Sequence, residues 1–220
     1  SDEYEAYTLK NRREIHKNPE LSFQEFRTAA LVCRELDALS IPWEKSPVEP
    51  GIIAQIDSGR PGKLLMLRAD MDALPIQEEN DLEFRSEREN VMHACGHDVH
   101  TANLLTVARI FNEMKDCFNG RVKLVFQPGE ESGGGGRRMI EQGLLDEKPD
   151  ACIGLHVFPW TQGKLVIGSG YLTAFSDGCT VKIHGKAAHS STPEEGVDAI
   201  GIAAAIVTAL NSVAARNISP

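Results

Sequence analysis

The sequence predicts an α/β protein: a three-layer α/β/α domain built on a mostly parallel sheet, followed by part of a smaller α+β domain. Short apolar runs typical of strands alternate with longer amphipathic stretches typical of helices, as in a parallel sheet covered by helices on both faces. The run 64–67 is continuously apolar, as expected of a buried strand. The pattern changes near Ser176, where we expect the second domain to begin.

The first elements are expected to be helices. Helical spacing continues to about Lys17, and Pro19 ends it because proline disfavours a helical conformation in the residue before it. A second helix is expected over 24–39, with an apolar face formed by Phe26, Ala30, Leu31, Leu36 and Leu39. Prolines then mark a loop over 40–50. Residues 51–57 and 63–70 are expected to form a strand pair around the turn 58–62.

Alternation of strand and helix resumes after a polar stretch over 75–90, which we expect to be surface loop. The spacing predicts helices over 100–114 and 135–145 and strands over 121–127, 151–157 and 163–168. Beyond Ser176 it predicts a half-exposed strand over 179–185 and a long apolar helix over 196–217. One strand and one helix cannot bury enough apolar surface alone. We therefore expect residues 1–175 to form the first domain and 176–220 the N-terminal portion of the second.

Composition excludes some classes of partner. The 220 residues include 32 acidic and 23 basic side chains, and the net charge of −9 disfavours non-specific binding to nucleic acid or to an anionic membrane. No apolar run approaches the roughly 18 residues of a membrane span, and residues 1–10 lack the charged and apolar segments of a leader. The five cysteines are odd in number and scattered, so we expect reduced thiols and a cytoplasmic protein.

Side chains able to bind metal or move protons follow the predicted strands where each strand ends. They are Asp70 and Asp72 after 63–70, Glu130 and Glu131 after 121–127, and His156 after the apolar residues 153–155. The turn before the helix over 100–114 adds Cys95, His97, Asp98 and His100. Because the carboxyl ends of parallel strands meet at one edge of a sheet, we expect all of these side chains to converge there.

Four of these residues are predicted to be metal ligands. Thiolate, imidazole and carboxylate groups bind zinc and related divalent ions, and Cys95, His97, Glu131 and His156 supply them. The adjacent pair Glu130 and Glu131 favours a division of labour, in which Glu131 coordinates metal and Glu130 is the base that takes a proton from a metal-bound water. Zn, Mn, Ni and Co all suit this ligand set.

The motifs around these residues also carry a resemblance. In order they are Leu67-Arg68-Ala69-Asp70-Met71-Asp72-Ala73-Leu74-Pro75, His93-Ala94-Cys95-Gly96-His97-Asp98-Val99-His100-Thr101-Ala102, Gln127-Pro128-Gly129-Glu130-Glu131, Gly154-Leu155-His156-Val157 and Gly185-Lys186-Ala187-Ala188-His189. Together they resemble the aminoacylase and carboxypeptidase family of dinuclear metallopeptidases (peptidase family M20). Within it they look like the amidohydrolase branch, which includes hippurate hydrolases, indole-acetyl-amino-acid hydrolases and N-acetyl-diaminopimelate deacetylases.

The resemblance implies a metal-dependent amidohydrolase that cleaves the amide bond of small N-acyl amino acids. It implies two divalent metal ions per subunit, held in part by Cys95, His97, Glu131 and His156, with Glu130 as general base and one more ligand histidine in sequence absent here. It also implies a homodimer formed through the smaller domain, a lid inserted into the catalytic domain, with His189 binding the substrate carbonyl across the dimer and stabilising the oxyanion. Gly129 and Glu194 depart from the commoner family residues, Ala and His, and Glu194 leaves the substrate open.

Other functions stay open on the sequence. A thiol enzyme would use Cys95 as nucleophile and His97 or His100 as base, and alkylation rather than chelation would inactivate it. A non-catalytic homologue would keep a closed structural metal site. A metallo-exopeptidase or aminoacylase of the same family would differ in its substrate alone. The remaining polar candidates are expected to have supporting or structural roles: Asp70, Asp72, His16, His93, His100 and His184.

Overall fold

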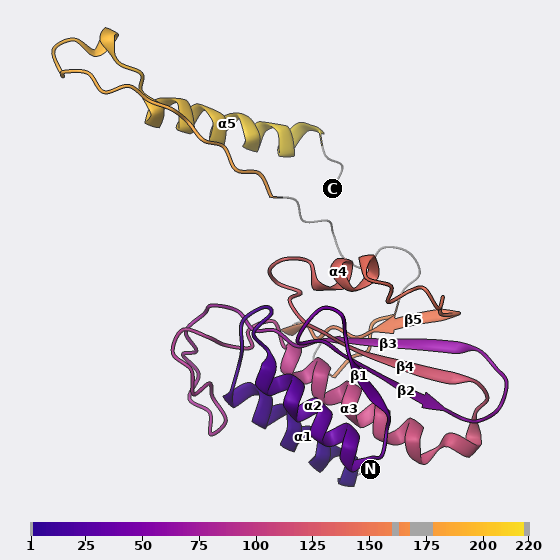
Figure 1. Cartoon of the computed structure of the whole chain (residues 1–220). Coiled ribbons are helices and arrows are strands. Elements are labelled where there is room, and N and C mark those ends of the chain that lie inside the picture. The colour runs from indigo at the N-terminus through magenta and orange to yellow at the C-terminus, as the bar shows by residue number, and fades with distance from the viewer. Residues whose placement is uncertain (1, 160–162, 168–177, 218–220) are drawn as a thin grey trace. The chain divides into compact units, whose positions relative to one another are not determined.

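The structure is a computed structural model that describes residues 2–159, 163–167 and 178–217. The chain divides into two compact units, Ser1–Leu165 and Val166–Pro220 (Figure 1). The domain boundary expected between residues 175 and 176 lies outside the described residues.

The first unit is built on a five-stranded sheet with the strand order β1-β2-β4-β3-β5. The strands are β1 (Trp43–Lys45), β2 (Ile52–Asp57), β3 (Leu64–Asp70), β4 (Arg121–Gln127) and β5 (Ala151–Gly154). β3 runs parallel to both β4 and β5, whereas β2 pairs antiparallel with β4 and β1 antiparallel with β2. The expected fold class is confirmed, and the three parallel strands are those whose carboxyl ends carry the candidate residues.

One expected pairing is wrong. β2 and β3 are consecutive in the sequence, but β4 lies between them and pairs with both. The reason is the burial of β4: Val122, Leu124 and Phe126 are buried on one face and Val125 on the other, so β4 takes the central position. The short strand β1 was also unexpected, because it falls within the predicted loop 40–50.

Helices cover both faces of the sheet. α1 (Asp2–Lys17), α2 (Phe26–Ala38) and α3 (His97–Glu113) lie on one face, and the short α4 (Gly135–Glu141) lies on the other (Figure 1). The main core forms under the three helices, where Val32, Leu36 and Leu105 meet β2, β3 and β4. A smaller core under α4 joins Met139 to Met66 and Val125. These layers confirm the predicted α/β/α arrangement.

The start of α2 is set by a buried glutamate. Glu20 is 4% exposed, and its carboxylate accepts hydrogen bonds from the backbone amides of Arg27 (3.1 Å) and Thr28 (2.9 Å). These amides belong to the first turn of the helix and have no partner within it. Glu20 therefore stabilises the helix start, which lies two residues later than the predicted Gln24.

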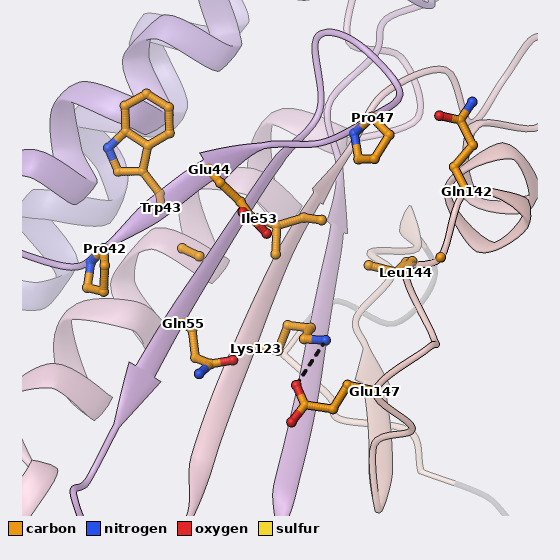
Figure 2. A pocket seen from close by; sticks show the side chains of 12 residues that line it. Pro42, Trp43, Glu44, Pro47, Ile53, Gln55, Lys123, Gln142, Leu144 and Glu147 are labelled. Carbon is orange, nitrogen blue, oxygen red and sulfur yellow. Dashed lines mark ion pairs between the residues drawn. The ribbon is translucent and has the colours of Figure 1, made fainter.

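An open groove of about 500 Å³ lies beside α4, on the part of the same sheet face that this helix does not cover (Figure 2). Its walls include Trp43 of β1, Ile53 of β2 and Leu144 beyond α4, and an ion pair of 3.5 Å joins Lys123 and Glu147 across it. The groove-lining residues include none of the predicted site residues. The groove is therefore separate from the candidate site.

Other element ends also differ from expectation. α3 begins at His97 rather than His100, α4 ends at Glu141, and β5 ends at Gly154. A short 3-10 helix, η1 (Lys115–Cys117), follows α3. Residues 163–167 form no strand, and residue 168 lies outside the described part of the chain.

The second unit contains a 3-10 helix, η3 (Pro193–Glu195), and the helix α5 (Ala199–Asn217). The strand expected over 179–185 is not formed. The one bridge in the described part of this unit joins Lys186 to Val197. A lone strand has no neighbour to pair its backbone groups, which explains the difference. No helix in the described parts of the chain is both long and apolar enough for a membrane span.

A buried ionic network joins α1, α3 and the loop 75–90. The ring of His16 is 3% exposed, its Nδ1 lies 2.8 Å from Asp98 Oδ2, and its Nε2 lies 3.1 Å from Glu78 Oε1. Arg12 also donates to Asp98, at 2.8 Å. Burial lowers the pKa of His16, but the hydrogen bonds to Asp98 and Glu78 outweigh it, so the net shift is upward. Since both ring nitrogens face carboxylates, the imidazolium form fits best.

Replacing Leu105 with Ala should destabilise the first unit by about 2–5 kcal/mol, because it leaves a cavity in the main core. Leu105 is fully buried. The free energy of unfolding in urea measures the loss. Leu82→Ala is the matched control, because Leu82 is 41% exposed, and an equal loss there would contradict the packing argument.

Replacing His16 with Gln should remove a pH-dependent part of the stability. A raised pKa in the folded state stabilises the fold fully below the unfolded pKa of about 6.5, and this contribution is lost as pH rises through the folded pKa. The gap in unfolding free energy between wild type and H16Q should therefore be largest below pH 6.5 and narrow above it. Urea titrations at several pH values measure the gap, with the exposed His184→Gln as control. A gap independent of pH would refute the assignment.

Candidate metal centre

The candidate residues lie where the parallel strands end. Asp70 is the last residue of β3, Glu130 and Glu131 follow β4, and His156 lies two residues after β5. His97 is the first residue of α3. This places four of the predicted site residues, together with the candidate Asp70, at one edge of the sheet, as the strand-end argument requires.

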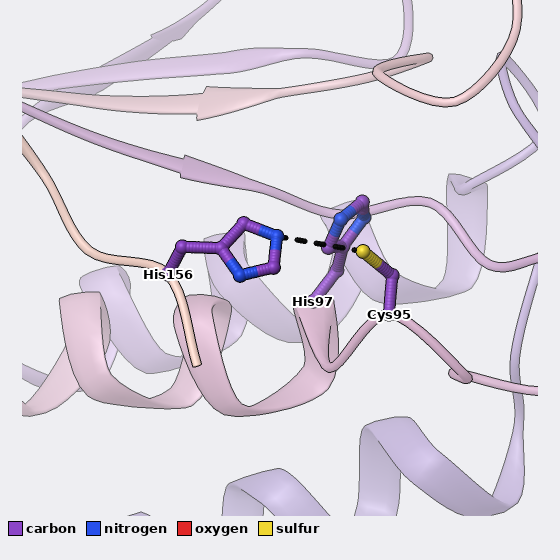
Figure 3. Close-up of side chains that lie close together, drawn as sticks. All are labelled: Cys95, His97 and His156. Carbon is purple, nitrogen blue, oxygen red and sulfur yellow. Dashed lines mark hydrogen bonds between the residues drawn. The ribbon is translucent and has the colours of Figure 1, made fainter. Parts of the chain in front are cut away.

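Three groups of side chains lie close enough to hold a metal ion. Cys95, His97 and His156 form one group, and the Sγ of Cys95 lies 3.4 Å from Nε2 of His156 (Figure 3). A second group contains His97 with Glu130 and Glu131, and a third contains His97 with Asp70 and His100. Within each group the ligand atoms lie within 4.8 Å of one another. His97 belongs to all three groups, so it is the centre of the cluster.

Two buried atoms of the cluster lack a hydrogen-bond partner in the part of the chain that the structure describes. They are Nε2 of His97 and Oε1 of Glu131, which lie 3.8 Å apart. A buried polar atom without a partner costs free energy, so such atoms are rare and need an explanation. A lone pair on nitrogen and a carboxylate oxygen, beside a thiol and a second imidazole, make the donor set that first-row divalent metals bind. The residues therefore fit a metal ion.

Asp72 orients two members of this cluster at once. Its Oδ1 accepts a hydrogen bond from Nδ1 of His97 at 3.2 Å, and its Oδ2 accepts from the backbone amide of Glu131 at 2.9 Å and from Ser22 at 2.6 Å. Burial opposes ionisation of Asp72, but these bonds outweigh it and lower its pKa to about 2. Because Nδ1 donates to Asp72, the neutral ring of His97 carries its lone pair on Nε2, which is the form that binds metal.

Asp70 and His100 form a second orienting pair. Nδ1 of His100 donates to Asp70 at 2.6 Å, and Nε2 of His100 accepts a hydrogen bond from the backbone amide of Val157 at 3.0 Å. Arg68 pairs with the other oxygen of Asp70 at 2.7 Å. Both nitrogens of His100 are thus engaged, which supports the expectation of a supporting role. Its contact with Val157 holds the residue next to His156.

Gly96 allows the turn that carries Cys95 and His97 to lie against the segment that follows β5. The backbone of Gly96 has φ 89°, and a Cβ added there would lie 2.4 Å from Cγ2 of Val157. A larger residue would therefore be strained and would push Val157 away. The glycine between Cys95 and His97 brings this turn against the segment that carries His156.

The electrostatic environment separates the roles of Cys95 and Glu130. Burial, together with the nearby Glu131, raises the pKa of Cys95 to about 12. A nucleophilic cysteine needs a lowered pKa, so this environment argues against the thiol-enzyme alternative and favours a cation beside the sulfur. Burial and Glu131 also raise the pKa of Glu130, which suits a group that accepts a proton.

One acidic residue near the site was missed by the sequence analysis. Glu25 has no exposed surface, and its Oε1 accepts a hydrogen bond from the backbone amide of Gly129 at 2.8 Å. Gly129 directly precedes Glu130. Glu25 falls inside the helix predicted over 24–39 and lies far in sequence from the other candidates, whereas the structure places it just before the start of α2. The pattern therefore held no signal for it.

Two further histidines, His93 and His189, belong to none of the three groups of ligand atoms found among the described residues. His93 is buried, and both of its ring nitrogens lack a hydrogen-bond partner among the described residues. Burial lowers its pKa to about 4, so the ring is neutral. His189 lies in the second unit, where its Nδ1 hydrogen-bonds the hydroxyl of Ser191 at 2.8 Å. Its predicted role on the substrate stays a prediction.

Comparison with known proteins shows which family this chain resembles. The family model described as "Peptidase family M20/M25/M40" matches residues 66–219. The chain is 40% identical to an N-acyl-L-amino acid amidohydrolase of Geobacillus stearothermophilus, covering 100% of this chain and 60% of the relative. It is also 40% identical to a hippurate hydrolase of Campylobacter jejuni (96% and 55%) and to thermostable carboxypeptidase 2 of Saccharolobus solfataricus (99% and 56%). The chain thus spans little more than half the length of these relatives.

Solved structures show a similarity to the same family. An aminohydrolase from methicillin-resistant Staphylococcus aureus superposes with a TM-score of 0.82 at 41% identity, covering 100% of this chain and 59% of that one. A Bacillus subtilis protein described as a dinuclear metal binding peptidase from the M20 family superposes with a TM-score of 0.69 at 38% identity, covering 72% and 45%. The chain therefore belongs to peptidase family M20.

Proposed function

We propose that this chain carries most of the metal site of an amidohydrolase that cleaves small N-acyl amino acids. The observation that carries the proposal is the pair of buried, unpartnered ligand atoms, Nε2 of His97 and Oε1 of Glu131, in a cluster with Cys95 and His156. The similarity to an N-acyl-L-amino acid amidohydrolase and to a hippurate hydrolase supports this substrate class.

Cys95, His97, Glu131 and His156 would hold two divalent ions, Zn or Mn in the first instance, as in the relative described as dinuclear. When bound, such ions supply Lewis acidity that polarises an amide carbonyl and activates water. Asp72 holds His97 in the tautomer that presents Nε2, and Asp70 with His100 fixes the backbone beside His156. These contacts preorganise the ligands before any metal arrives.

Glu130 is proposed as the general base. It lies beside His97 and Glu131 but is itself exposed, so its carboxylate is open to water and substrate. It would take a proton from the attacking water and pass it to the nitrogen of the leaving amino acid as the amide C–N bond breaks. The raised pKa of Glu130 favours the first transfer, in which the carboxylate accepts the proton.

His189 and the dimer are further parts of the proposal. We infer that His189, which is exposed in the second unit, binds the substrate carbonyl and stabilises the oxyanion across a homodimer formed through residues 176–220. The five free cysteines support a cytoplasmic location. The similarity to a thermostable carboxypeptidase keeps a metallo-exopeptidase as the second candidate, with the same site and a different substrate.

The first test is an assay of the full-length gene product on N-acetyl, N-benzoyl and N-indoleacetyl amino acids, with dipeptides as the competing class. We expect hydrolysis of at least one N-acyl amino acid, loss of activity with a chelator, and recovery on adding Zn²⁺ or Mn²⁺. Metal analysis of the purified protein gives the stoichiometry. Activity that survives chelation but is lost on alkylation would instead favour the thiol enzyme, and faster cleavage of dipeptides would favour the exopeptidase.

The second test replaces Glu130 with Gln. Removing the base should lower kcat by about 10²- to 10⁴-fold, because proton transfer in the transition state is lost. Metal content should stay near that of the wild type, since Glu131 and the other ligands are unchanged. Glu83→Gln, at an exposed loop position, is the matched control. Retained turnover in E130Q would rule out the assignment of Glu130.

A further inference from the structure

The backbone on both sides of Glu130 is held by buried carboxylates. Oε1 of Glu25 accepts the amide of Gly129 at 2.8 Å, and Oδ2 of Asp72 accepts the amide of Glu131 at 2.9 Å. These amides belong to the residues immediately before and after Glu130. Two fixed points around one residue determine where its Cα lies and in which direction its side chain leaves the backbone.

The turn before α2 packs against the same loop. Phe23 has φ 63°, and its ring lies so close to Gly129 that a Cβ there would come within 2.4 Å of it. Gly129 itself has φ 61°. Residues 23–25 therefore form a wall against which the loop 128–131 is folded, and Glu25 supplies the polar contact in that wall.

Glu25 is an unusual residue for this position. It has no exposed surface, and within the described ranges no cation pairs with it and its Oε2 has no hydrogen-bond partner. Burial, with a contribution from nearby Asp72, raises its pKa to about 7. A buried carboxyl with an oxygen that lacks a hydrogen-bond partner costs more free energy than an apolar side chain of the same size. Stability alone therefore does not account for a glutamate here.

We propose that Glu25 is a positioning residue for Glu130, and that it and Asp72 hold the two ends of the Gly129–Glu131 backbone so that the general base faces the metal cluster. The proposal rests on the proposed function for the role of Glu130. It assigns no contact between Glu25 and substrate. Glu25 acts through the Gly129 amide, so any residue that keeps an acceptor oxygen there should preserve the effect.

The test compares three variants of the full-length gene product. Glu25→Met keeps the volume of the side chain and removes the acceptor, with Glu25→Ala as its substitute if the methionine variant does not fold. Glu25→Gln keeps an acceptor oxygen for the Gly129 amide. Glu20→Met is the matched control: Glu20 is also a buried glutamate next to α2 that accepts backbone amides, but those amides belong to Arg27 and Thr28 rather than to the loop of Glu130.

For E25M we expect kcat to fall about 10- to 100-fold, because small displacements of a catalytic group have effects of this size. KM and metal content should change less than about threefold, since substrate and metal ligands are untouched. E25Q should recover most of the lost kcat. E20M should lower the melting temperature yet keep kcat near the wild-type value. Wild-type kcat in E25M, an equal loss in folded E20M, or no recovery in folded E25Q would each overturn the proposal.

Hydrogen exchange separates this proposal from the proposed function. The amides of a peptide spanning residues 127–132 should exchange faster in E25M than in the wild type, E25Q or E20M, whether or not the protein hydrolyses any substrate tested. An inactive wild type would refute the proposed function, and the exchange rates would still decide whether Glu25 holds the loop. Equal exchange in E25M and wild type would refute the positioning role.

Discussion

The arrangement of the site depends on one buried carboxylate, that of Asp72. It meets the ring of His97, the amide of Glu131 and the hydroxyl of Ser22, and so joins the turn before α2, the end of β3, the loop after β4 and the start of α3. A carboxylate with several donors stays ionised when buried, which is why the pKa of Asp72 is low. If that charge were removed, the imidazole would lose the partner of its Nδ1, and the loop of Glu131 would lose one of its two carboxylate anchors.

Much of this could be predicted from the sequence, because it follows from local patterns and one general rule. Apolar runs located β3, β4 and β5, and parallel strands end at the same edge, so the sequence alone leads one to expect that Asp70, Glu131 and His156 converge. The supporting role expected for His100 agrees with its contacts to Asp70 and the Val157 amide. The ligand roles themselves stay predictions, supported by the partnerless atoms of His97 and Glu131.

What could not be predicted depends on contacts between segments distant in the sequence. The position of β4 between β2 and β3 is decided by how deeply each strand is buried, which no single segment reveals. The same holds for Glu25, whose partner Gly129 lies 104 residues away. The strand expected over 179–185 fails for a related reason: its alternating pattern describes a strand that needs a neighbour, and the described part of the second unit provides one bridge instead of a ladder.

The short strand β5 links the site to the stability of one edge of the sheet. Its four residues are exposed, and among the described residues β3 is the one strand that pairs with it. Such an edge is expected to open more readily than the central strands β3 and β4. His156 leaves from the end of this strand, whereas His97 and Glu131 are anchored to the core. A metal ion bound by His156 together with His97 or Glu131 would oppose the opening of this edge. Occupancy of the site and docking of β5 would therefore be thermodynamically linked, each strengthening the other.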